Sequence, residues 1–141
     1  MSNYNCAIRT NYFKVKDDEE FEIFLGHIIG EELDIFDSED ENGNKLYALG
    51  CYGNIWGYRE DLDDEDCECD YDQFIEGLQR HVSNDDAVII LEAGNERLRY
   101  VNGYVTVITS TGVKFEDITT IGINFAKELL GSSEYSTKVR Y

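Results

Sequence analysis

The chain has 141 residues, which fits a single domain of common size, and it carries a formal net charge of −18 at pH 7. Its hydrophobic fraction of 42% can supply a core, so the charge does not make the whole chain disordered. The charge excludes direct binding to nucleic acid or anionic lipid, because both are dense arrays of negative charge. The chain has no run of about 18 apolar residues and no signal-peptide pattern at its start, which predicts a cytoplasmic protein.

The acidic residues are concentrated in one part of the chain. Residues 17–72 hold 21 acidic residues against only Lys45 and Arg59, a net charge of −19. All other residues together hold 10 basic and 9 acidic side chains, a net of +1. The sequence therefore describes a nearly neutral scaffold with one strongly anionic half.

The first half of the chain predicts strands around one helix. Residues 4–16 are rich in aromatic and β-branched side chains and predict a strand. Asp17 predicts the N-cap of a helix whose apolar residues recur at helical spacing up to Ile28. Residues 33–37 and 45–52 predict two short strands that are joined at Asn42-Gly43.

Residues 50–58 predict a loop rich in glycine and aromatic residues, and the acidic run 59–69 predicts an exposed loop. Asp70 predicts the N-cap of a second amphipathic helix that extends to Val82. Residues 87–91 predict a central strand that is apolar on both faces.

Two further strands, over residues 97–109 and 113–115, precede a helix that begins near Asp117 and ends at Gly131. The apolar side of this helix predicts a buried face. The order of elements predicts an α+β fold, with an antiparallel or mixed sheet and about three helices packed on one of its faces. The chain contains no proline, no repeat and no linker, so we expect residues 1–141 to form one domain.

No catalytic motif is recognisable, and we expect no enzyme activity, no cofactor and no metal site. His27 and His81 are not placed beside a patterned nucleophile, and acids in a hydrated run lack the desolvation that acid catalysis requires. Partial calcium-loop patterns begin at Ser38 and Asp61, but each lacks required positions. The C-x-C pair Cys67 and Cys69 could ligate a metal only if other ligands converged on it.

The acidic run predicts a surface that binds a basic protein partner. Nine acidic residues fall within residues 60–72, a density that costs self-repulsion beyond what solubility requires. Tyrosine and tryptophan, the usual anchors of protein interfaces, lie among these acids. The predicted partner-binding residues are Asp37, Glu39, Asp40, Glu41, Trp56, Tyr58, Glu60, Asp61, Asp63, Asp64, Glu65, Asp66, Glu68, Asp70, Tyr71 and Asp72.

The spacing of carboxylates is compatible with mimicry of phosphates. Side chains on one face of a strand are about 6.6–7 Å apart, and helix neighbours are about 5–6 Å apart. A DNA duplex presents one phosphate per roughly 3.4 Å on each strand, so two staggered rows of acids could approximate its field. An arginine-rich groove that binds phosphate could then bind these acids with electrostatic steering.

Residues 9–17, with the sequence RTNYFKVKD, and later Leu98-Arg99-Tyr100 and Gly103-Tyr104 resemble a group of small acidic proteins. These proteins are carried by phages, plasmids and other mobile elements of gut bacteria. Inhibitors of host defence, including anti-CRISPR proteins that act on Cas9, occur among such proteins. The resemblance implies a protein that blocks the DNA- or guide-binding surface of a Cas9-type nuclease in the bacterial cytoplasm.

Three alternatives stay open from the sequence. The acidic cluster with Cys67 and Cys69 could serve a metal-binding protein or a metal-dependent enzyme. The chain could be a scaffold protein of a mobile element without a role in defence. A homodimer could also form, because Arg97, Arg99 and the basic tail could meet the acidic half of a second copy.

Overall fold

The computed structural model describes residues 4–138 and confirms the α+β class. Six antiparallel strands form one sheet in the order β3-β4-β1-β6-β7-β8. Their bounds are β1 Asn5–Thr10, β3 Asp34–Glu39, β4 Lys45–Tyr52, β6 Val88–Glu96, β7 Tyr100–Thr109 and β8 Gly112–Asp117. A small second sheet pairs β2 (Ile28–Gly30) with β5 (Ile55–Tyr58).

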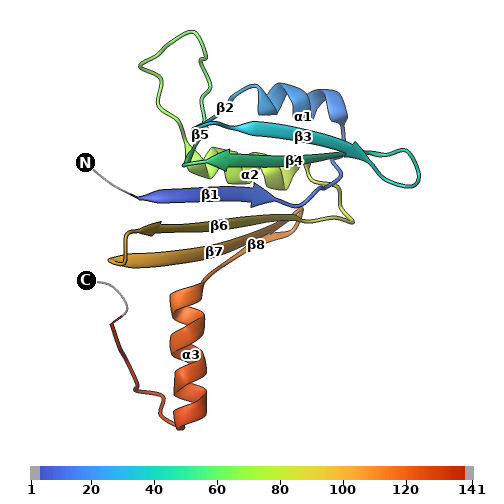
Figure 1. Cartoon of the computed structure of the whole chain (residues 1–141). Helices are drawn as coiled ribbons and strands as arrows, with labels where there is room; N and C mark the ends of the chain where they lie inside the picture. The colour runs from blue at the N-terminus through green and yellow to red at the C-terminus, as the bar shows by residue number, and fades with distance from the viewer. Residues whose placement is uncertain (1–3, 139–141) are drawn as a thin grey trace.

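Three helices accompany the sheets: α1 (Asp18–Leu25), α2 (Tyr71–His81) and α3 (Ile118–Leu130). Figure 1 shows α1 and α2 beside the half of the sheet formed by β3, β4 and β1, and α3 beyond the edge formed by β8. Within residues 4–138, none of these helices has the length and apolar character needed to cross a membrane.

Each helix begins at an aspartate, as the sequence predicts. The side chains of Asp17, Asp70 and Asp117 each accept a hydrogen bond from the backbone N–H three residues later, at 3.0, 3.1 and 2.7 Å. These bonds satisfy backbone N–H donors that the first helical turn leaves without partners. The negative carboxylates are also attracted by the positive end of the helix dipole. Gly131 ends α3 with a φ of 65°, a left-handed conformation that glycine adopts without strain.

The core lies between the sheet and helices α1 and α2. Phe13, Phe21, Tyr47, Phe74 and Leu78 are at most 2% exposed. Phe21 makes edge-to-face contacts with Phe13 and Tyr47, with ring centroids 5.7 and 5.0 Å apart. These contacts fasten α1 to β4 and to the segment that follows β1.

Residues 55–58 form a strand, so the prediction of a continuous loop over residues 50–58 is wrong. Strand β5 pairs with β2, which lies more than twenty residues earlier in the chain, at Ile28↔Tyr58 and Ile29↔Gly57. The segment is too short for its own pattern to indicate a strand, and it is stabilised by pairing with β2 and by two backbone hydrogen bonds between Tyr58 and Asp70. Gly57 has a φ of 126° and contacts the Asp70 backbone so closely that an added Cβ would lie 2.5 Å from it.

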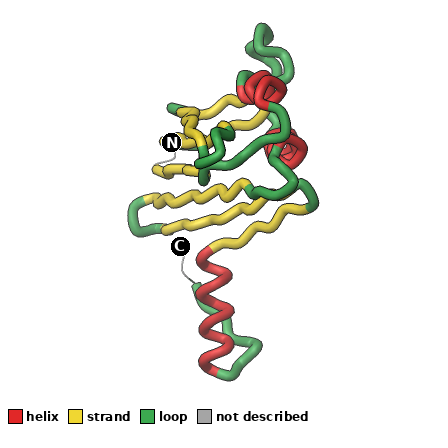
Figure 2. Tube along the Cα trace, turned by 90° about the vertical axis from the view of Figure 1, so that its right-hand side faces the viewer, coloured by secondary structure: helices red, strands yellow, loops and turns green. Residues whose placement is uncertain are grey.

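Helix α3 differs from the other two because it has no buried face. None of its thirteen residues is buried, whereas α1 and α2 each bury three. Phe125, Leu129 and Leu130 are 59%, 88% and 62% exposed. In Figures 1 and 2 the helix extends away from the sheet as a stalk, so its predicted buried face has no body of protein over it.

Gly77 allows α1 and α2 to pack closely, which generates a prediction about stability. A Cβ at Gly77 would lie 2.0 Å from the ring of buried Phe24. We expect Gly77→Ala to lower the free energy of unfolding by about 1–3 kcal/mol, the usual cost of overpacking a core. Urea denaturation followed by circular dichroism measures this change.

The control is Gly122→Ala, also at a helical glycine, where an added Cβ has nothing within 4 Å. It should leave stability unchanged or raise it by about 0.5–1 kcal/mol, because alanine favours the helix. Equal midpoints for the Gly77→Ala variant and the wild type would contradict the close packing of α1 on α2.

Candidate functional site

The loop of residues 59–69, here called the acidic loop, joins β5 to α2 and projects from the molecule (Figure 1). Every carboxylate in it is exposed: Glu60, Asp61, Asp63, Asp64, Glu65, Asp66 and Glu68. Asp70 and Asp72, at the start of α2, are exposed as well. The structure therefore places the predicted acids of residues 60–72 together at one end of the domain.

Some of these carboxylates also shape the loop. The side chains of Asp61 and Asp64 accept hydrogen bonds from the backbone N–H groups of Asp63 and Asp66, at 3.0 and 2.9 Å. Such bonds form Asx turns, which fold the backbone without help from distant residues. Asp70 is used in the same way as the N-cap of α2. The charges of the loop thus have a defined arrangement.

Within residues 4–138, no basic side chain forms an ion pair with a carboxylate of the acidic loop. In the described part of the chain, ion pairs join Lys14 to Asp85, Lys45 to Glu22, and Arg99 to Glu96, and none involves residues 59–72. Arg59, the one basic residue of the loop, is partly buried at its base. The exposed carboxylates of this surface are therefore screened mainly by water and dissolved ions.

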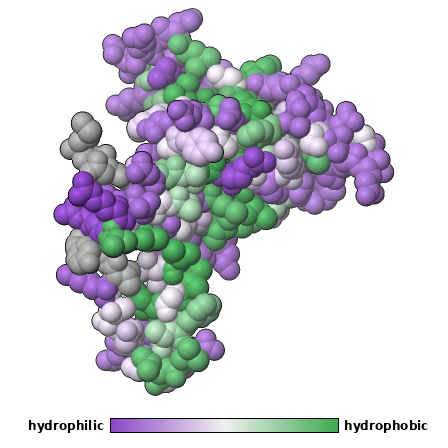
Figure 3. All heavy atoms as spheres, viewed as in Figure 1, coloured by the Kyte–Doolittle hydropathy of each residue, from purple (hydrophilic) through white to green (hydrophobic). Residues whose placement is uncertain are grey.

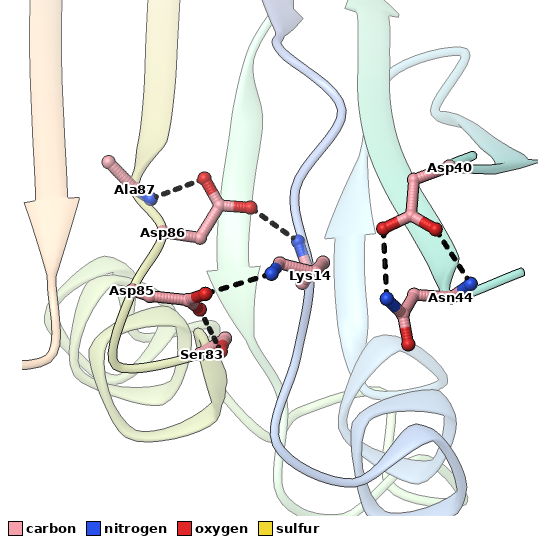
Figure 4. A network of polar contacts seen from close by, with 7 residues as sticks. All are labelled: Lys14, Asp40, Asn44, Ser83, Asp85, Asp86 and Ala87. Atoms are coloured by element: carbon pink, nitrogen blue, oxygen red, sulfur yellow. Dashed lines mark hydrogen bonds and ion pairs between the residues drawn. The ribbon is translucent and has the colours of Figure 1, made fainter. Parts of the chain in front are cut away.

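Acids near the other end of the strands are engaged within the scaffold, as Figure 4 shows. Lys14 donates from Nζ to Asp85 at 2.9 Å and from its backbone nitrogen to Asp86 at 2.8 Å. Hydrogen bonds from Ser83, and then from Lys14, hold the pKa of Asp85 below its usual range. These contacts connect the segment after β1 to the segment before β6, which gives these acids a structural role.

The hairpin of β3 and β4 carries the second group of predicted acids. Asp37, Glu39 and Glu41 are exposed. Asp40 is partly buried, and its carboxylate accepts bonds from the backbone of Asn42 and from the backbone and side chain of Asn44. The bond from the Asn44 side chain is the largest cause that holds the pKa of Asp40 below its usual range (Figure 4).

The hairpin and the acidic loop lie apart, and α1 connects them. Lys45, the first residue of β4 after the hairpin turn, pairs with Glu22 near the middle of α1 at 3.4 Å. Just after the C-terminal end of α1, His27 accepts the Arg59 N–H through its backbone carbonyl at 2.9 Å. The exposed acids of α1 and its N-cap fill the space between the two groups: Asp17, Asp18, Glu19, Glu20 and Glu22. We call the acidic loop, α1 and the hairpin together the acidic band (Figure 1).

The acids of α1 were not among the predicted site residues. They occupy the first turn of a helix, where acidic residues stabilise the helix dipole, so the sequence offers a local reason for them. Their exposure and their place between two other acidic groups depend on the tertiary structure. In the sequence, only the net charge of residues 17–72 indicated that the acids of α1 belong to the same anionic surface.

The three predicted aromatic anchors differ in accessibility. Trp56 is 49% exposed and lies beside the acidic loop, where it shares a hollow of about 510 Å³ with Glu65 and Asp66. Tyr71 is 46% exposed and lines a second hollow of about 350 Å³ with Glu60 and other residues. Tyr58 is partly buried and stacks on Phe24 and His27, so it supports the core.

The cysteines are free thiols in the described residues. Cys67 and Cys69 are partly exposed in the acidic loop, and Cys51 is buried in β4. Among residues 4–138, no three side chains of histidine, cysteine, aspartate or glutamate are arranged to hold a metal ion. Cys67 contacts the Glu68 carbonyl at 3.8 Å.

Comparison with protein-family models, with curated protein sequences and with solved structures gives no match to this chain.

The buried thiol of Cys51 generates a prediction about reactivity. Burial disfavours the charged thiolate and raises the pKa of Cys51 to about 11. At pH 8 roughly one molecule in a thousand then carries the reactive thiolate at this position. We expect iodoacetamide at pH 8 to modify Cys67 and Cys69 well before Cys51, as measured by mass spectrometry of peptides over time.

The same reaction in concentrated urea is the control, because all four thiols should then react at similar rates. Modification of Cys51 in the folded protein at the rate of Cys67 would contradict its burial in β4.

Proposed function

We propose that the protein is a stoichiometric inhibitor that binds a nucleic-acid-handling protein through its acidic band. The observation that carries this proposal is the acidic loop, with exposed carboxylates that are held in turns and have no basic partner in the described structure. The carboxylates take the place of phosphates in the partner's binding groove. The proposed target is a Cas9-type nuclease with its guide RNA in the bacterial cytoplasm.

The chemistry of the surface supports a basic partner. An anionic ligand would be repelled, and the hollows beside Trp56 and Tyr71 have carboxylates in their walls. Grooves that bind nucleic acid are lined by lysine and arginine, and these side chains form charge-assisted bonds to carboxylates as they do to phosphates. Long-range attraction of this kind raises the rate of association, and salt weakens it.

The arrangement of the band supports recognition beyond simple attraction. The turns at Asp61 and Asp64 fix the loop, so less conformational entropy is lost when a partner binds. Trp56 and Tyr71 provide exposed aromatic surface at the edge of the charged area. Aromatic residues contribute more binding energy at interfaces than most others, so they would hold the partner after the charges have attracted it.

The test neutralises charge without changing the fold of the loop. The variant combines Asp63→Asn, Glu65→Gln and Asp66→Asn, since these side chains accept no hydrogen bond in the described structure, and leaves Asp61, Asp64 and Asp70 intact. Exposed ion pairs contribute about 0.2–1 kcal/mol each, so three losses should weaken binding about 3- to 150-fold. The measurement is inhibition of DNA cleavage by a guide-loaded Cas9-type nuclease, at low and at high salt.

The matched control neutralises three acids outside the band: Glu116→Gln, Glu128→Gln and Glu134→Gln. It changes the net charge by the same amount, and we expect it to inhibit like the wild type. Wild type and the two variants also serve as baits in a lysate from a CRISPR-bearing bacterium. Wild type and the control variant should retain a nucleic-acid-binding protein that competing DNA releases, and the loop variant should retain less of it. Equal inhibition or equal recovery with the two variants would exclude the acidic loop as the binding surface.

A further inference from the structure

The second unusual surface lies at the opposite end of the molecule from the acidic band. Helix α3 and the open face of the sheet meet there around a hollow of about 390 Å³. Its apolar lining includes Leu91 of β6, Val105 of β7, and Ile118 and Ile121 of α3. Phe125 and Leu129 continue the same side of α3 at helical spacing. We call these six residues the apolar corner.

The apolar corner is exposed to an extent that folding alone does not explain. Leu91, Ile118, Phe125 and Leu129 are 54%, 51%, 59% and 88% exposed. Figure 3 shows hydrophobic residues on the stalk and along the middle of this face, while hydrophilic residues predominate at the upper left and upper right. Contiguous apolar patches on soluble proteins commonly mark interaction sites.

The chain itself covers a different side of α3. Residues that follow the helix return along it, and Tyr135 and Thr137 face Ile123 and Ala126 across a separate hollow. The side with Phe125 and Leu129 stays open. Because α3 extends away from its own sheet, it cannot fold onto that sheet's open face while it continues directly from β8 (Figures 1 and 2).

The charge distribution is compatible with a second copy of the chain as the occupant. Residues 97–141 contain six basic and four acidic side chains, a net charge of +2, against −19 for residues 17–72. Two copies can therefore meet at this end without placing their acidic halves together. Five strand spacings of about 4.8 Å put about 24 Å between β3 and β8. That distance exceeds the Debye length of about 8 Å at physiological salt.

The exposed apolar area approaches what such a contact needs. At about 150–200 Å² for a large apolar residue, the four exposed members of the corner offer on the order of 400–500 Å² per copy. A twofold-symmetric contact uses the same surface on both copies, so the apolar area doubles to about 900 Å². A standard interface buries about 1,600 Å² in total, and homodimer interfaces are about 65% apolar.

We propose that the protein is a homodimer in which α3 of each copy packs into the apolar corner of the other. Phe125 and Leu129 of one copy lie against Leu91 and Val105 of its partner, and the twofold axis repeats this contact. The arrangement covers the open side of α3 and the open sheet face at once. The acidic bands stay at the two outer ends.

Sedimentation equilibrium over a dilution series tests the proposal with the full chain. We expect wild type to have twice the mass of the 16.2 kDa chain, and the double variant Phe125→Gln, Leu129→Gln to have the mass of one chain. The control variant Ile23→Gln, Leu62→Gln removes exposed apolar residues elsewhere and should stay dimeric. A monomeric wild type, or a dimeric double variant, would overturn the proposal.

A mixing experiment tests the arrangement. Leu91→Glu alters the sheet side of the corner and should also give a monomer. Mixed with the Phe125, Leu129 variant it should form a heterodimer, because one intact helix then meets one intact sheet face. A Leu91→Glu variant that stays dimeric would mean that the helices pair with each other, which would exclude the proposed packing. Circular dichroism melting confirms that each variant is folded.

Discussion

The packing of Phe21 is the interaction on which the rest of the structure depends. Its ring contacts Phe13, Phe24, Tyr47 and His81 with centroid distances of 5.0–5.9 Å. These residues come from four separate parts of the chain, so one side chain fastens α1 to the sheet and to α2. Loss of a buried phenylalanine typically costs about 3–5 kcal/mol, a large part of the 5–15 kcal/mol that stabilises a domain. Because Phe21 and its neighbours turn the apolar side of α1 toward the core, the acidic side of the helix faces solvent between the hairpin and the acidic loop.

Repulsion among the negative charges of the acidic half opposes compact folding. Hydrogen bonds from the backbone to some of its carboxylates offset part of this repulsion. Aspartates at turns and helix starts accept backbone hydrogen bonds, as at Asp17, Asp40, Asp61, Asp64 and Asp70. These bonds give the carboxylates a structural role without neutralising them. A small domain needs a net charge of only about 2–8 for solubility, well below the 18 found here. The excess is therefore consistent with a surface that attracts a basic partner.

The sequence predicted features that depend on neighbouring residues and missed those that depend on distant ones. The N-caps at Asp17, Asp70 and Asp117 and the helix stop at Gly131 were correct, because a cap needs only a few adjacent residues. The pairing of β2 with β5 was missed, because each strand is short and its partner is remote. For α3, the prediction of a buried face was wrong, because an apolar pattern cannot say whether any surface of the fold covers it. The acidic loop was found from composition, whereas its connection to the hairpin through α1 required the fold.

The two edges of the sheet differ in charge, and this separates the two proposed contacts. Strand β3 at one edge carries three acids and no base, while β8 at the other edge carries Lys114 with two acids and exposes Val113 and Phe115. A partner held at the acidic band does not need to touch α3, and a second copy at the apolar corner does not cover the band. In a dimer joined at the corner, the two bands face outward from opposite ends. With the bands at opposite ends, the proposed dimer would engage two partners separately, one at each band.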